Sequence, residues 1–213
     1  IVVPGKPQSI QLDFNKTTVG VQGSGKNETL LIHANVKDNK NNPVADGVRV
    51  KFEIVGAHDN AVSLTPSGAT QFVSSPVSTV NGTATVSFHS GTRAGAHRVK
   101  ATVVDSLGTV ITPAISSETT QFMVVSGPAF LDTSDMNDPF TNSHMTVSGW
   151  PRIIFAEALN TDVSRTTVSV IVADRYSNPV PEGTAVYFSS TGGVIDTKTG
   201  FTDSKGIATV TLY

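Results

Sequence analysis

Apolar and polar residues alternate along most of this chain. From Leu30 to Lys37 every second residue, beginning with Leu30, is apolar, and the residues between them are mostly polar. The same period of two returns in residues 48–54 and again in 99–103. Because this period places alternate side chains on opposite faces of a strand, these segments are predicted to be antiparallel strands with one face on a core and one in water.

Clusters of turn-forming residues separate the alternating segments. The stretch DNKNNPVADG, residues 38–47, combines Asp, Asn, Pro and Gly, which set turn dihedrals or hydrogen-bond to their own backbone. Asn81-Gly82 has the composition of a tight hairpin turn. Short strands at regular intervals predict an all-β sandwich or barrel.

Part of the sequence occurs twice. VKDNKNNPVADGVRVKF at 36–52 matches VADRYSNPVPEGTAVYF at 172–188, and GTATV at 82–86 matches GIATV at 206–210. A weaker match joins IVVPG at 1–5 to MVVSG at 123–127. These repeats predict two domains, residues 1–125 and 126–213, and lead us to expect that the chain is a slice of a longer array.

The repeated motifs resemble the bacterial Ig-like group 1 domain, the repeat of intimin- and invasin-type surface adhesins. Its pattern D-x-x-G-N-P-V-x-G-x-x-V-x-F is matched by DNKNNPVADGVRVKF, and its two later motifs are matched by NGTATVSF and SGTRAGAHRVKA. This resemblance implies an all-β fold of tandem immunoglobulin-like β-sandwiches. It covers most of residues 5–125 and about half of the remainder.

The second repeat departs from the pattern in two ways. It carries an insertion at about 135–165, and it has no counterpart of HRVKATV or TTQFMVV, so we expect a sandwich that is incomplete at its C-terminus. Missing strands would leave an open sheet edge. A continuing parent chain, the insertion folding back, or a strand-donating partner subunit would each close that edge, and we favour the first.

Composition excludes several classes of partner. The net charge is −2 and 15% of the residues are charged, so no basic field is available for nucleic acid or an anionic membrane. The longest apolar runs are far shorter than the ~20 residues of a membrane span. Without Cys the chain has no disulfide, thiolate metal site or Cys nucleophile.

No motif in the chain predicts catalysis or a bound cofactor. Gly20, Gly25 and Lys26 have the spacing of a phosphate-binding loop, but Asn27 stands where Ser or Thr would bind magnesium, and a strand rather than a helix is expected to follow. The five His residues are scattered without a local metal-binding pair, and no Ser lies in a nucleophile elbow. We expect a protein that is not an enzyme.

Two groups of residues are candidate binding sites. Asp132, Asp135, Asn137 and Asp138 offer oxygen ligands for calcium, although ordinary Asp and Asn turns explain them better. Trp150 and Phe155 lie in the insertion and are candidate aromatic anchors for a protein or glycan. For Trp150 we favour a structural role, in which the ring plugs the end of a sandwich.

The function implied by the resemblance is structural. The chain would be a non-catalytic extracellular stalk segment that contacts adjacent Ig-like domains and holds an active domain away from a bacterial surface. Three alternatives stay open: a module that binds a host protein, a glycan or a neighbouring subunit through the insertion; an assembly subunit that accepts a donated strand; and an accessory domain of an exported enzyme.

Overall fold

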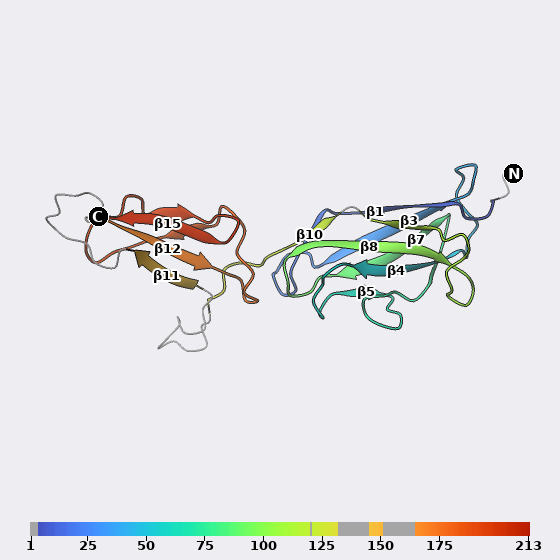
Figure 1. The fold of residues 1–213 in the computed structure, drawn as a ribbon, viewed down its shortest axis with the longest axis horizontal. Helices are drawn as coiled ribbons and strands as arrows, with labels where there is room; N and C mark the ends of the chain where they lie inside the picture. The colour runs from blue at the N-terminus through green and yellow to red at the C-terminus, as the bar shows by residue number, and fades with distance from the viewer. Residues whose placement is uncertain (1–3, 120, 132–144, 151–164) are drawn as a thin grey trace. The chain divides into compact units, whose positions relative to one another are not determined.

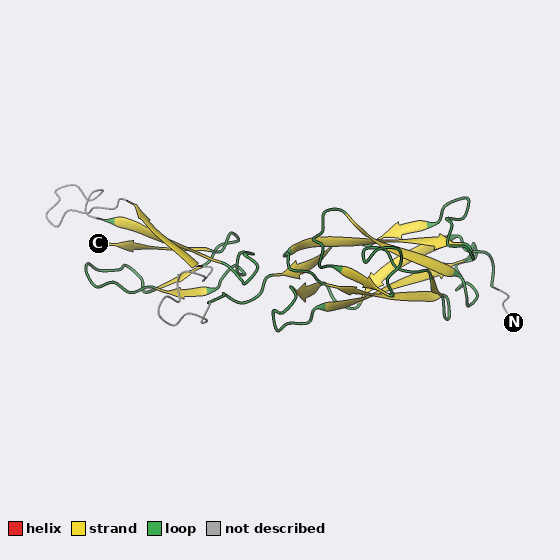
Figure 2. Cartoon of the chain, turned by 90° about the horizontal axis from the view of Figure 1, so that it is seen from below, coloured by secondary structure: helices red, strands yellow, loops and turns green. Residues whose placement is uncertain are grey.

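The computed structural model describes residues 4–119, 121–131, 145–150 and 165–213, and all the regular structure in them is β-strand (Figures 1 and 2). The chain divides into two compact units, residues 1–125 and 126–213. No helix in the described part of the chain is long and apolar enough to cross a membrane.

Unit 1 consists of two sheets (Figure 1). One has the order β1-β3-β7-β5, and the other has the order β2-β10-β8-β4-β6 with β9 also pairing with β8. All neighbours are antiparallel except β2 and β10, which are parallel. The strands are β1 (Ser9–Phe14), β2 (Thr18–Gly20), β3 (Thr29–Lys37), β4 (Arg49–Val55), β5 (Ser63–Thr65), β6 (Val77–Ser78), β7 (Thr83–His89), β8 (Gly95–Val104), β9 (Ser116–Glu118) and β10 (Phe122–Val125).

The core of unit 1 is built from the alternating residues. Leu30, Ile32, Ala34 and Val36 of β3 are buried, as are every second residue of β4, β7 and β8. Three aromatic rings pack together: the ring centroid of the buried Phe88 lies 4.9 Å from that of the buried Phe122, which lies 5.9 Å from that of the half-buried Phe14. Burial of one face of each sheet is the driving force for this sandwich.

Unit 2 repeats part of this architecture. Its larger sheet has the order β11-β12-β15, with β11 (Met145–Trp150), β12 (Thr166–Val172) and β15 (Ile207–Leu212). A second sheet pairs β13 (Ala185–Tyr187) with β14 (Thr199–Phe201). These strands correspond to β1, β3, β7, β4 and β6 of unit 1, in that order, because the pairings and the repeated sequences coincide.

The described residues of unit 2 contain no counterpart of β8, β9 or β10. Its core is correspondingly small: Val170, Val172, Val180, Phe188, Ala208 and Val210. The predicted fold class, all-β with tandem Ig-like sandwiches, is confirmed. The structure differs from the sequence-based expectation at β11, which lies inside the expected insertion and pairs with β12 as β1 pairs with β3.

Candidate functional site

The clearest constellation of polar groups in unit 1 surrounds Asp38, which follows β3 directly. Its residue is 4% exposed, and its Oδ1 accepts N–H bonds from Lys40 and Asn42, both at 2.9 Å. Its Oδ2 accepts the N–H of Gly5 at 3.1 Å, across 33 residues of sequence. The carboxylate therefore closes its own turn and also holds the segment that enters the unit.

Asp174 forms the same arrangement in unit 2. Its Oδ1 accepts the N–H groups of Tyr176 and Asn178, both at 2.9 Å. Its Oδ2 accepts the N–H of Gly127 at 2.9 Å, across 47 residues. We call each pair, Asp38 with Gly5 and Asp174 with Gly127, a linker clamp.

The repeated sequence explains the geometry of the clamp. The third residue after each Asp has a positive φ, 64° for Asn41 and 65° for Ser177, and Asn or Ser stands there in place of the Gly of the family pattern. A left-handed residue reverses the chain, so that the N–H two residues after the Asp and the N–H four residues after it both point back at the carboxylate. Pro then starts the return path, through a bridge between Lys37 and Pro43 in unit 1.

The small size of Gly5 also belongs to the clamp. A Cβ on Gly5 would lie 3.0 Å from the Cβ and the Oδ2 of Asp38, closer than ordinary van der Waals contact. Glycine therefore lets the entering backbone approach the carboxylate. The weak sequence match between residues 1–5 and 123–127 ends on the glycine that each clamp binds.

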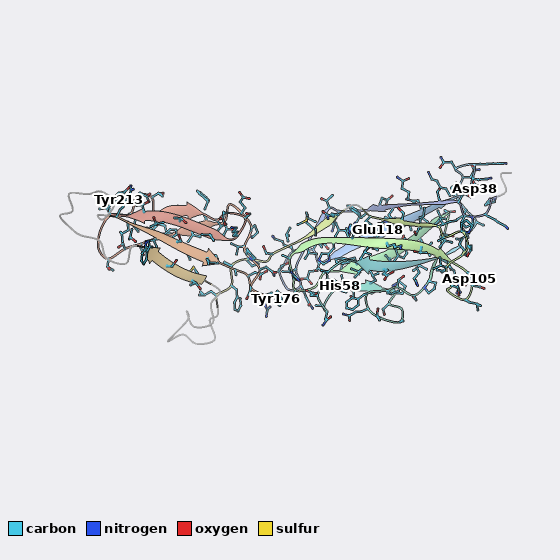
Figure 3. The ribbon with its side chains drawn as sticks, viewed as in Figure 1. Asp38, His58, Asp105, Glu118, Tyr176 and Tyr213 are labelled. Atoms are coloured by element: carbon cyan, nitrogen blue, oxygen red, sulfur yellow. The ribbon has the colours of Figure 1, made fainter. Side chains whose placement is uncertain are left out.

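Two further Asp turns lack the linker bond. Asp105 accepts the N–H groups of Leu107 and Thr109, and Asp203 accepts those of Lys205 and Ile207. Neither carboxylate bonds to a linker backbone among the described residues. Asp105 lies at the same end of unit 1 as Asp38 (Figure 3). Asp105 and Asp203 can therefore serve as controls, because each stabilises its own turn without holding a linker.

The hydrogen bonds to Asp38 favour the charged form of this carboxylate. The N–H of Asn42, together with those of Gly5 and Lys40, lowers the pKa of Asp38 below its usual 3.8, although burial acts in the opposite direction. A lowered pKa means that folding favours the ionised form, so this contribution to stability is present above about pH 4 and is lost as the pH falls through the lowered value.

A second polar cluster lies toward the other end of unit 1, where Figure 3 labels His58. His97 is 5% exposed and packs against the rings of Phe88 and Phe122. The Nδ1 atoms of His58 and His97 are buried without a hydrogen-bond partner among the described residues. No group of three or more His, Cys, Asp or Glu side chains in that part of the chain is placed to hold a metal.

The residues singled out from sequence are placed as follows. Asp132, Asp135, Asn137, Asp138 and Phe155 lie outside the described residues, so the calcium hypothesis is untested. Trp150 ends β11 with 77% of its surface exposed, and the expectation that it plugs a sandwich end is therefore wrong. Nothing in the described structure covers this ring.

The glycine-rich loop after β2 is a strand connection, as predicted. Gly20 ends β2, and Thr29 begins β3 with no helix between them. The N–H of Gly23 donates to the Glu28 carboxylate at 2.7 Å, which places a negative charge at the loop where a phosphate would have to bind. This context gives no helix N-terminus for an anion.

Sequence comparison finds no match, since no family model matches the chain and no curated protein does. Structural comparison finds FdeC, an Escherichia coli adhesin, with a TM-score of 0.55 and 16% identity over 99% of this chain and 57% of that one. InvD of Yersinia pseudotuberculosis matches with a TM-score of 0.54 and 16% identity over 94% of this chain and 48% of that one.

The chain thus spans about half the length of these two structures. At 16% identity the likeness establishes the fold alone. That fold is a tandem of immunoglobulin-like β-sandwiches, of the kind found in bacterial surface adhesins.

Proposed function

We propose that this chain is a non-catalytic spacer, a stalk segment of a bacterial cell-surface protein of the adhesin type. The observation that carries the proposal is the linker clamp, which occurs in both units with the same donor and acceptor atoms. A spacer has to transmit length, and its joints must therefore be short and constrained. Fixing the entering backbone to a buried carboxylate serves this purpose.

Few residues separate the last strand of unit 1 from the first hydrogen bond of the unit 2 clamp. β10 ends at Val125, and Gly127 is already bonded to Asp174, so that Ser126 is the single residue between them. Phe130 adds a further bond, from its N–H to the carbonyl of Ala173 at 3.0 Å. Backbone freedom in this linker is therefore restricted to very few dihedral angles, which favours a stiff joint.

The remaining parts of the proposal follow from the spacer role. The chain would be extracellular, at the bacterial surface, with the neighbouring Ig-like domains of its own chain as its main partners. It needs no cofactor for this role. If calcium binds at Asp132, Asp135, Asn137 and Asp138, it would stiffen the region after the joint, and the melting temperature would then rise with millimolar calcium and fall with chelator.

Backbone ¹⁵N relaxation of the whole chain tests the spacer role. If the joint is stiff, residues of unit 1 and unit 2 report one anisotropic rotational diffusion tensor. Two units that tumble independently would report separate tensors with shorter correlation times, and this result would contradict the proposal. The measurement needs no knowledge of a ligand.

One observation favours a second candidate function, recognition through Trp150. An indole with 77% of its surface exposed is available for an intermolecular contact. We expect Trp150→Ala to change the free energy of unfolding by less than about 0.5 kcal/mol, as surface substitutions do. A loss of about 3–5 kcal/mol in chemical denaturation, the usual cost of replacing a buried aromatic residue by Ala, would instead mean that the ring is part of a core.

A further inference from the structure

The outer face of the small sheet in unit 2 carries two exposed aromatic rings. Ala185 pairs with Phe201 and Tyr187 pairs with Thr199, so these four side chains share one face, which we call the aromatic face. Tyr187 is 69% exposed and Phe201 is 65% exposed. They are diagonal neighbours across the two strands, a separation that aromatic side chains can bridge.

Unit 1 shows that this face has no structural need for aromatic residues. The corresponding strands are β4 and β6, and the positions equivalent to Tyr187 and Phe201 hold Lys51 and Ser78. The core-facing positions do not change in this way, because Val50 and Phe52 recur as Val186 and Phe188. The two repeats thus keep the inner face and exchange a polar outer face for an aromatic one.

Exposed rings of this kind need a reason other than folding. A solvated sheet face is normally polar, and an aromatic ring in water loses the free energy that its burial would supply. Tyr187 and Phe201 do not join the core cluster of unit 2. They are therefore free to contact a ligand.

The size of the face favours a small ligand over a protein. A buried aromatic side chain covers about 150–250 Å², so two rings exposed to about two-thirds offer on the order of 250 Å². A standard protein interface needs roughly 800 Å² from each partner. The face thus provides about a third of what a second copy of the chain or another protein would require.

The chemistry of the face favours a neutral, hydroxyl-rich ligand. No residue of β13 or β14 is charged, so the two strands themselves offer no charge to a ligand. Thr199 supplies a hydroxyl beside the rings. Tyr187 also borders a cavity of about 260 Å³ whose lining includes Ser189, Ser190 and Lys198, side chains that can hydrogen-bond to the hydroxyl groups of a ligand.

We propose that the aromatic face binds a neutral saccharide, with a sugar ring stacked across Tyr187 and Phe201. The C–H groups on one face of a pyranose ring are weakly positive and pack against the negative face of an aromatic ring. The sugar hydroxyls at the ring edge then bond to Thr199 and to water. This binding is independent of the spacer role, since it uses no residue of either linker clamp.

Amide NMR titration of the whole chain tests the proposal with three neutral glucose hexasaccharides: cellohexaose, laminarihexaose and maltohexaose. We expect at least one of them to shift the amides of residues 185–187 and 199–201, with a dissociation constant in the millimolar range, about −4 kcal/mol of binding free energy. The double variant Tyr187→Lys with Phe201→Ser should weaken that binding by about tenfold or more. These substitutions install residues that the equivalent strands of unit 1 already carry, so folding should be retained.

The other outcomes overturn the proposal. Trp150→Ala is the matched control and should bind as the parent does, whereas shifts that centre on Trp150 would move the site to β11. Equal affinity of parent and double variant would exclude the aromatic face. The absence of shifts with all three sugars at about 10 mM would overturn the proposal that the aromatic face binds a neutral saccharide. Concentration-dependent shifts at the same amides without sugar would identify the face as a contact between copies.

Discussion

At the scale of single residues, the most unusual group is the buried His97. Its ring lies 5.6 Å from Phe88 and 6.2 Å from Phe122, measured between ring centroids. Burial lowers its pKa below the usual 6.5, the charges of His58 and Arg93 lower it further, and Asp59 acts in the opposite direction. The neutral ring is therefore the form that the folded unit accommodates.

This lowered pKa predicts acid sensitivity of unit 1. Because the unfolded chain takes up the proton first, the contribution of His97 to stability is complete above about pH 6.5 and is lost as the pH falls toward the lowered value. We expect His97→Phe to flatten the dependence of urea stability on pH between about 7 and 5.

Ser177 carries backbone strain that a single substitution should relieve. With φ at 65° it occupies the left-handed region, which costs a residue with a Cβ about 1 kcal/mol or more. We expect Ser177→Gly to raise the free energy of unfolding of unit 2 by about 0.5–1 kcal/mol. Ser204→Gly, in the Asp203 turn at a residue without a positive φ, should stabilise nothing; equal gains in both variants would refute the strain argument.

Among the elements, the turn that follows each clamp Asp packs against a second turn, which precedes β7 in unit 1 and β15 in unit 2. A Cβ on Gly82 would lie 2.6 Å from that of Pro43, and a Cβ on Gly206 would lie 3.2 Å from that of Pro179. In both units the carbonyl of this glycine accepts an N–H from the end of the neighbouring strand, from Val36 at 2.8 Å in unit 1. The two turns therefore pack as one block.

A pair of glycine substitutions measures this packing. Gly82 and Gly47 both have positive φ, 77° and 91°, but a Cβ on Gly47 would meet nothing within 4 Å. Gly47→Ala should cost about 1–2 kcal/mol for the backbone alone, and Gly82→Ala should cost about 1–3 kcal/mol more for the overlap with Pro43. Equal losses in chemical denaturation would show that the turns do not pack together.

Sequence patterns predicted the elements that have a strong period or a repeat. The alternation in β3, β4 and β8 and the duplicated turn at Asp38 were readable because each is local. The sequence did not predict β11, because Met145–Trp150 lies in a segment without a visible counterpart in the first repeat. The hydrogen bond between Gly5 and Asp38 could not be predicted from a local sequence pattern, because the two residues are 33 positions apart.

The aromatic residues show where such reasoning fails. Trp150 was expected in a core because large rings usually contribute to one, yet 77% of its surface is exposed. The exposure of Tyr187 was equally hidden, since its place on the outer face follows only from the register of β13 with β14. Side-chain burial depends on the opposite sheet, which the sequence of a single strand does not contain.

In the whole molecule, the backbone that enters each unit is held by a carboxylate of that unit, Asp38 or Asp174. Asp174 is the residue that does so at the joint between the units, through Gly127. Asp203 has the same turn without the linker bond. Comparing the two carboxylates therefore separates joint stiffness from the stability of unit 2.

The most direct test is a double electron–electron resonance measurement between nitroxides at Thr85→Cys and Thr167→Cys, one in each unit of a chain that has no Cys of its own. We predict a narrow distance distribution for the parent, a distinctly broader one for Asp174→Asn, and a parent-like width for Asp203→Asn. A parent distribution already as broad as that of Asp174→Asn, or equal widths in all three chains, would contradict the claim that the clamp stiffens the joint.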